Sequence, residues 1–148
     1  MSISFHVAGL PQTKGSLRQW HRHRADGNCL LGISEQGGPR LGEWRALVAT
    51  AAKRAMRQAP PLDGPIAVEL TFIFPRPKKQ APEVADCPYV WGNRRWDLDK
   101  LQRAIFDAMT DAAVWNDDSQ VAHVMAEKRY KDPYPGGPGC NISVEPLT

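Results

Sequence analysis

The feature of this chain that most constrains its fold is an alternating apolar segment at residues 65–74, followed by an amphipathic segment at residues 97–111. In the first segment every second side chain is large and apolar, as expected of a strand with one buried face. In the second segment the apolar side chains recur at helical spacing along one stripe. The members of that stripe are Leu98, Leu101, Ile105, Ala108, Met109 and Ala112. The two patterns predict a strand followed by a helix.

Five further segments extend this pattern. We expect strands at residues 2–8, 121–131 and 141–144, a possible short strand at residues 29–33, and a helix at residues 42–57. The helix at 42–57 would carry an apolar stripe that includes Trp44 and Leu47. The order of elements predicts an α+β fold, a mixed β-sheet with two main helices, in a single domain over residues 1–148. Stretches rich in Pro, Gly and charge predict mobile loops at about 10–28 and 76–93.

Composition argues against several classes of protein. Cys29, Cys87 and Cys140 lie far apart without a Cys-x-x-Cys motif. We therefore expect reduced thiols in a cytoplasmic protein rather than a disulfide framework. No apolar run approaches the roughly 18 residues that span a bilayer, and the first residues lack a secretory pattern, so no membrane partner is expected. The sequence contains no Gly-x-x-x-x-Gly-Lys or Gly-x-Gly-x-x-Gly motif, which argues against chemistry on a nucleotide cofactor, and no Gly-x-Ser-x-Gly motif of a serine nucleophile.

Charge is distributed unevenly along the chain. Residues 1–60 carry nine Lys or Arg and three Asp or Glu, whereas residues 61–148 carry ten and thirteen. A basic region beside an acidic centre is expected of a protein that binds a polyanion and holds a metal ion at its carboxylates. The alternative is that both regions are merely solvated faces.

Two pairs of carboxylates form the acidic centre, Asp97 with Asp99 and Asp117 with Asp118. Carboxylates without Cys or His partners suit a hard divalent cation such as Mg²⁺. Residues i and i+2 share a face of an extended chain, but they differ by about 200° in a helix. Asp97 and Asp99 can therefore converge only if the chain is extended at Asp97 and helical near Asp99. Helix capping by either residue, and an ordinary turn at Asp117-Asp118, are the structural alternatives.

Two cations lie within the same segment. Arg103 follows Asp99 by four residues and shares its helix face. Arg103 either forms a surface ion pair or stabilises charge that develops on a phosphorane-like transition state. Lys100 points about 60° away from Arg103 around the helix axis and is an auxiliary candidate.

Two motifs here resemble those of the RusA-type crossover-junction endodeoxyribonucleases, which resolve Holliday junctions. The first reads Asp97-Leu98-Asp99-x-Leu101-Gln102, and continues as basic-Ala-x-Phe-Asp-Ala. The second reads Trp115-x-Asp117-Asp118-x-Gln120-Val121. The opening of the chain, a strand followed by Gly-x-Pro, a Lys/Arg-rich loop and a helix, is similar as well. The dense match covers about residues 94–131, and a looser one covers most of the chain.

The resemblance implies a homodimeric nuclease that uses Mg²⁺ or Mn²⁺ and resolves four-way DNA junctions by paired nicking. It also implies a bacterial or phage-encoded protein of the cytoplasm. The family's metal-binding and catalytic carboxylates carry over onto Asp97, Asp99 and Asp118, with Asp117 as an auxiliary residue. The family's motif Lys falls on position 103, here Arg103, and the Asn that commonly follows the second Asp falls on Lys100.

These two departures leave the level of activity open. Arg103 keeps a positive charge but does not readily give up a proton. A catalytically weakened DNA-junction-binding module of the same fold is therefore the alternative to a nuclease. The remaining alternative is an unrelated α+β protein whose Asp residues are caps and turns.

Cations interleaved with Trp residues predict the DNA contacts, because Arg and Lys bind phosphates and Trp stacks on unpaired bases. The candidates are Lys14, Arg18, Arg22, Arg24, Arg94 and Arg95. A weaker hypothesis is a zinc site at His21, His23 and Cys29, which lacks a fourth ligand.

Overall fold

Strand β4 (Ile66–Phe74) lies inside a four-stranded mixed sheet whose strand order is β1–β6–β4–β5. It pairs antiparallel with β6 (Gly139–Pro146) and parallel with β5 (Val121–Tyr130), and β6 pairs antiparallel with β1 (Ile3–Ala8). Parallel strands cannot be joined by a tight turn, so the chain crosses the sheet between β4 and β5 through helix α3 (Leu98–Asp111). The computed structural model describes residues 1–15, 17–35, 38–78, 86–92, 96–132 and 136–148.

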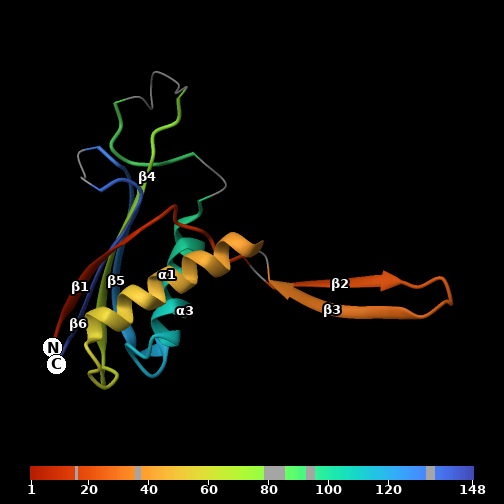
Figure 1. Cartoon of the computed structure of the whole chain (residues 1–148), viewed down its shortest axis with the longest axis horizontal. Helices are drawn as coiled ribbons and strands as arrows, with labels where there is room; N and C mark the ends of the chain where they lie inside the picture. Colours follow the sequence, from red (N-terminus) through yellow and green to blue (C-terminus); the bar gives the residue numbers. More distant parts are fainter. Residues whose placement is uncertain (16, 36–37, 79–85, 93–95, 133–135) are drawn as a thin grey trace.

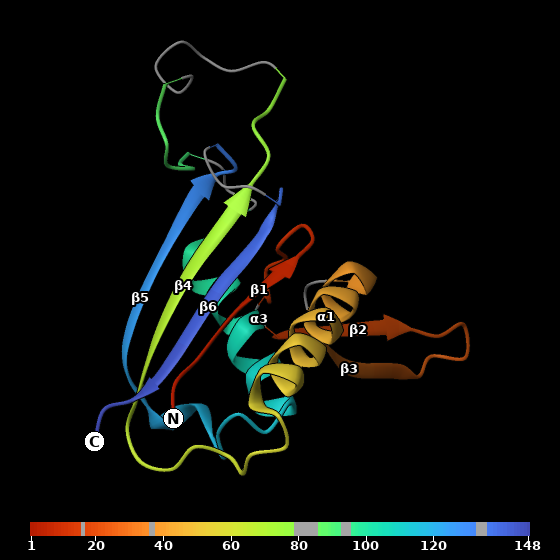
Figure 2. The same cartoon turned by 60° about the vertical axis from the view of Figure 1, so that its left-hand side comes forward.

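Both long helices cover one face of this sheet (Figures 1 and 2). Helix α1 (Gly38–Met56) packs beside α3 and over β1, and α3 lies between α1 and β5. The outer face of the sheet carries polar side chains such as Ser4, which hydrogen-bonds to Ser143 at 3.0 Å. The expectation of an α+β fold with a mixed sheet and two main helices is confirmed.

The core lies between the helices and the sheet. The alternating side chains of β4 that face the helices are buried, as the sequence pattern predicted, and so is most of the α3 stripe. Trp44 and Trp115 are also buried, with 2% and 1% of their surface exposed. The assignment of Leu47 to the apolar stripe of α1 is wrong, because half of its surface is exposed and Leu41, Ala52 and Met56 fill the interface.

The expected loop at residues 10–28 contains a strand. Strand β2 (Leu17–His23) pairs antiparallel with β3 (Cys29–Glu35) to form a two-stranded hairpin that extends away from the rest of the molecule (Figure 1). The possible short strand at residues 29–33 is thus confirmed and is longer than expected. Every side chain from residue 21 to residue 31 is exposed. Strand β2 shows no apolar alternation, as expected where the described side chains of the hairpin, residues 21–31, are all exposed.

A glycine fits the position where β6 enters the sheet. A Cβ atom at Gly139 would collide with the backbone oxygen of Val7 and approach the ring of His6 to 2.9 Å. Any side chain at position 139 would therefore push β1 away from β6.

The region predicted as a loop at residues 76–93 is only partly within the described residues. Its described end is attached to β5, since Tyr89 forms a bridge with Arg129 and the guanidinium of Arg129 lies 4.6 Å from the Tyr89 ring centre. The mobility of this loop stays a prediction. Among the described residues, every helix is too short or too polar to cross a membrane.

Candidate active site at the two ends of helix α3

The start of α3 has the conformation that the sequence required. Asp97 is extended, with φ −65° and ψ 130°, and the helix begins at Leu98. The Asp97 carbonyl accepts the first helical hydrogen bond, from the Leu101 N–H at 3.0 Å. Its side chain makes no capping hydrogen bond. The Asp97 carboxylate is therefore not used as a helix cap and is available for other chemistry.

An aromatic stack fixes the entry into α3. Trp96 lies against Phe74 at the end of β4, with ring centres 4.1 Å apart and an interplanar angle of 25°. The Lys128 Nζ on β5 donates a hydrogen bond to the Trp96 carbonyl at 2.9 Å. These contacts attach the residue before Asp97 to both parallel strands, so the carboxylate is presented from a fixed backbone.

Each carboxylate at this end of α3 has a cation beside it. Lys100 Nζ lies 3.3 Å from Asp97 Oδ2, and Arg103 Nη2 lies 3.6 Å from Asp99 Oδ2. The Asp99 side chain is 65% exposed and that of Arg103 is 53% exposed. Exposed pairs of this kind contribute at most about 1 kcal/mol, so a divalent cation could displace them at low cost.

Asp118 belongs to a rigid turn near the other end of the helix. Asp117 accepts a hydrogen bond from the Ser119 N–H at 2.8 Å, and Gln120 Oε1 accepts from the Asp117 N–H at 3.1 Å. This capping box begins the short 3₁₀ helix η1 (Asp118–Gln120), which leads into β5. Asp117 therefore has a structural role, as the turn alternative anticipated.

The same turn is joined to the chain that enters β4. Gln120 Nε2 donates to the carbonyls of Leu62 at 2.9 Å and Gly64 at 3.1 Å. The Leu62 N–H donates to the Val114 carbonyl at 2.7 Å. The turn that carries Asp118 is consequently attached by hydrogen bonds to the segment that leads into β4.

A pocket of about 160 Å³ lies beside Asp118. Its lining includes Thr110 and the carboxylates of Asp107, Asp111 and Asp117. Arg45 from α1 binds Asp111 in a bidentate manner, through Nε–Oδ2 at 2.6 Å and Nη2–Oδ1 at 3.0 Å. The pocket is therefore acidic, with α1 supplying a compensating cation.

Lys14 supplies a second cation to this pocket. Its Nζ lies 2.5 Å from Asp107 Oδ2, and its backbone N–H donates to the Lys100 carbonyl at 3.0 Å. The segment that leads from β1 to the hairpin is thereby attached to α3. Lys14 was predicted to contact DNA; the structure pairs it with Asp107, and the DNA contact stays a prediction.

The surroundings shift the pKa values of the pocket carboxylates in opposite directions. The pKa of Asp118 is raised, first by desolvation and then by the neighbouring Asp117 and Asp107. The pKa of Asp111 is lowered, mainly by its hydrogen bond from Arg45. The pKa of Asp117 is lowered by the hydrogen bond from the Ser119 backbone. Asp118 is thus the carboxylate of this turn whose negative charge a cation would relieve most.

Within one chain the structure does not bring Asp97, Asp99 and Asp118, the predicted metal-binding carboxylates, to one pocket. Asp118 lies with Asp107, which is eight residues beyond Asp99, or about 12 Å along a helix that rises 1.5 Å per residue. Among the described residues, no three His, Cys, Asp or Glu side chains are grouped closely enough to hold a metal ion. The length of α3 separates the two pairs, because η1 follows the helix end while Asp97 precedes its start.

The remaining candidates lie on or near the hairpin. Arg22 and Arg24 are exposed there, whereas the side chain of Arg18 and the whole of Arg94 and Arg95 lie outside the described residues. The His21 and His23 rings lie in edge contact, with centres 4.9 Å apart. Together with Cys29 they do not form a metal-holding group.

Four residues of the site were missed by sequence reasoning, namely Arg45, Asp111, Gln120 and Lys128. Asp111 could have been found, since it follows Asp107 by four residues and so shares its helix face. Arg45 and Lys128 act from other elements, and only the packing of α1 and β5 brings them to the ends of α3.

The fold and site define an α+β protein in which two carboxylate pairs lie at opposite ends of one crossover helix. A family model described as Endodeoxyribonuclease RusA matches residues 33–144, and the chain belongs to this family. Proteins named Crossover junction endodeoxyribonuclease RusA from Escherichia coli (strain K12) and Shigella sonnei (strain Ss046) are 64% identical over 28 residues. That match covers 19% of this chain and 23% of each relative.

Proposed function

We propose that this chain is a metal-dependent endodeoxyribonuclease that resolves four-way DNA junctions by paired nicking, and that it acts as a homodimer. Membership in the RusA family supports an endonuclease of this class, and the curated relatives carry the name of a crossover-junction endodeoxyribonuclease. The observation that carries the proposal is the uncapped, extended Asp97 at the start of α3. Its carboxylate makes no hydrogen bond that caps the helix, and its partner in the structure is the exposed Lys100.

The donor chemistry of the site fits Mg²⁺ or Mn²⁺. Asp97, Asp99 and Asp118 offer only carboxylate oxygens, which hard divalent cations prefer. When bound, such a cation would activate water and stabilise the leaving oxygen of a phosphodiester. The raised pKa of Asp118 reflects a negative charge that is poorly compensated within the chain. A bound cation would supply that compensation.

Within one chain the two carboxylate pairs lie apart, and a two-fold dimer could bring a pair from each subunit together. If two copies place their α3 helices antiparallel, Asp99 of one copy approaches Asp118 of the partner subunit. The symmetry creates two identical sites, which suits a substrate with two strands to be cut. Arg103 and Lys100 would lie beside each site, and the exposed Arg22 and Arg24 of the hairpin would contact the DNA backbone.

A mixing experiment tests the function and the shared site together. Asp99→Asn and Asp118→Asn chains should each fail to nick a synthetic four-way junction in Mg²⁺. Mixed after brief unfolding and refolding, they form heterodimers with one intact shared site, so nicking of one strand should return. Nicking by neither the parent protein nor the mixture would refute the nuclease. Nicking by the parent protein but not the mixture would refute only the shared site.

A junction-binding module is the second candidate, and the ion pairs at the start of α3 favour it. Lys100 and Arg103 already compensate Asp97 and Asp99, which weakens the attraction for a metal ion. This candidate predicts tight, structure-selective junction binding by the parent protein without metal-dependent nicking. The parent reaction in the experiment above therefore separates the two candidates.

A further inference from the structure

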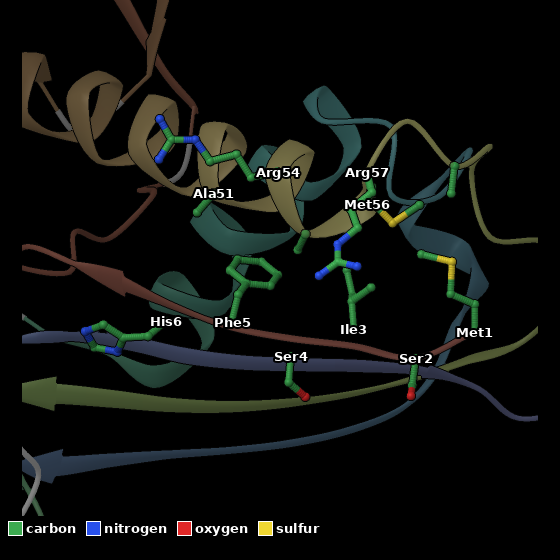
Figure 3. Close-up of a pocket in the computed structure, with 12 residues that line it drawn as sticks. Met1, Ser2, Ile3, Ser4, Phe5, His6, Ala51, Arg54, Met56 and Arg57 are labelled. Carbon is green, nitrogen blue, oxygen red and sulfur yellow. The ribbon is translucent and has the colours of Figure 1, made fainter.

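A groove of about 850 Å³ lies between β1 and the second half of α1, away from the carboxylates of α3 (Figure 3). Its floor is apolar and includes Ile3, Phe5, Ala55 and Met56. Figure 3 shows Ile3 and Phe5 pointing from β1 toward α1, while Ser4 points to the opposite side of the strand. The lining includes no acidic side chain.

The backbone of β1 has hydrogen-bonding groups available along this groove. β1 is the edge strand of the sheet and pairs only with β6 among the described residues. The Gly9 N–H donates to the Pro138 carbonyl at 3.1 Å, and hydrogen-bonded positions recur every second residue in an antiparallel pair. Ile3, Phe5 and Val7 therefore turn their backbone groups to β6, and Ser4 and His6 turn theirs outward. Ser4 and His6 both line the groove.

Two arginines flank the groove, Arg54 in the last turn of α1 and Arg57 just after the helix. Both are exposed, and neither has an ion-pair partner in the part of the chain that the structure describes. Arg57 has a φ of +50°, a left-handed conformation that Gly or Asn usually adopts at a helix end. A non-glycine residue held in this conformation is strained, and such strain is a reason to look for a function of the side chain.

From these features we infer that the β1 edge is a docking site for an extended acidic segment of another protein. The segment would add to the sheet as a fifth strand by hydrogen-bonding to Ser4 and His6. Its side chains on the helix side would place apolar groups on Phe5 and Ala55 and carboxylates at Arg54 and Arg57. The segment is recognised by three features, namely extended backbone, alternate apolar side chains and negative charge.

Charge and geometry favour this occupant over two others. A second copy paired through β1 would bring the Arg54 and Arg57 pairs of both copies toward one edge, and like charges repel. A DNA backbone would use the two arginines but neither the apolar floor nor the outward amide groups of a strand. This docking site is independent of the nuclease activity proposed above.

A peptide titration tests the inference on the full chain. The probe is a fluorescent nine-residue peptide, Thr-Val-Thr-Glu-Thr-Val-Thr-Glu-Thr, and its control carries Lys in place of both Glu. Anisotropy should show saturable binding of the acidic peptide, and none of the basic one, below about 1 mM. Amide signals of Ser4 and His6 should shift in two-dimensional NMR spectra. Absence of saturable binding, or equal binding of both peptides, would overturn the inference.

Three variants locate the binding. Arg57→Gly relieves the left-handed strain and should not lower Tm, yet it should weaken peptide binding about tenfold by removing one charge-assisted hydrogen bond. Ser4→Pro removes an outward N–H, which an edge strand tolerates, and should abolish binding in a folded protein. Lys53→Ala, on the same helix but outside the groove, should bind as the parent does. Unchanged binding by Arg57→Gly would refute the site, as would displacement of the peptide by four-way junction DNA.

Discussion

Lys14 and Asp107 form an ion pair of 2.5 Å that joins the segment before the hairpin to the middle of α3. The pair lies next to Asp118, whose pKa responds to both charges. The predicted contact of Lys14 with DNA stays a prediction. Because this ion pair ties Lys14 to Asp107, the DNA contacts of the hairpin are tested more cleanly with other cations.

Charge reversal on the hairpin should weaken junction binding. We expect Arg22→Glu with Arg24→Glu to lower affinity and to reduce the log–log salt slope by about 0.9 for each phosphate that is no longer neutralised. Both side chains are exposed, so the fold should be unaffected. Binding titrations at several salt concentrations measure the slope, with Lys131→Glu on the main body as the matched control. An unchanged slope would exclude the hairpin from the DNA surface.

Substitution of Arg103 should separate charge from proton transfer. Its guanidinium stays protonated at any working pH, so it can act only as a fixed cation beside Asp99. Arg103→Ala should slow nicking by about 10²-fold, as expected on removing a group that stabilises transition-state charge, and Arg103→Lys should retain substantial activity. Initial nicking rates at saturating Mg²⁺ provide the test. A parent-like rate for Arg103→Ala would make this residue a surface ion-pair partner, and a much faster Arg103→Lys would favour the junction-binding module.

Neutralising Asp118 should leave stability intact while it abolishes nicking. The folded protein holds this carboxyl at a raised pKa because of desolvation and the nearby Asp117 and Asp107. For an acid with a raised pKa, ionisation opposes folding once the pH passes its ordinary value of 3.8. Asp118→Asn should therefore have a Tm at pH 7 equal to or above that of the parent, measured by thermal unfolding without metal. A lower Tm would show that the carboxylate has a structural role.

The Arg45–Asp111 pair should stabilise the fold in a pH-dependent manner. The pKa of Asp111 is lowered, mainly by the Arg45 hydrogen bond, so its contribution is present above pH 3.8 and is lost as the pH falls further. Both side chains are partly exposed, and Arg45→Met should cost no more than about 1 kcal/mol at pH 7. Denaturant unfolding at pH 7 and at pH 3 should show the difference between variant and parent shrinking at the lower pH. An equal difference at both pH values would assign the effect to packing of the Arg45 side chain.

The sequence predicted those elements that bury one face. The alternation of β4 and the helical stripe of α3 arise from contact with the core, so both patterns were visible in the residues themselves. The conformation at Asp97 was also predictable, because only an extended residue before a helix lets Asp97 and Asp99 share a side. Strand β2 was not predictable in this way, since its residues show no apolar alternation and its described side chains, from residue 21 on, are exposed.

The separation of Asp118 from Asp97 and Asp99 could not be read from spacing. Residue counts place Asp118 shortly after α3, but the capping box and the Gln120 hydrogen bonds decide toward which end of the helix it points. The ion pairs Lys14–Asp107 and Arg45–Asp111 depend on how the segment after β1 and helix α1 pack against α3. Such interactions between distant segments leave no periodic pattern in a sequence.

The position of β6 between β1 and β4 has a consequence for biosynthesis. During translation β6 emerges after the other described elements, yet it supplies the pairing partner of both strands. Until then β1 and β4 lack the strand with which both pair, and apolar residues of the core stay exposed to solvent on the nascent chain. The protein is therefore expected to acquire its native sheet only after β6 has left the ribosome tunnel, in one late and cooperative step.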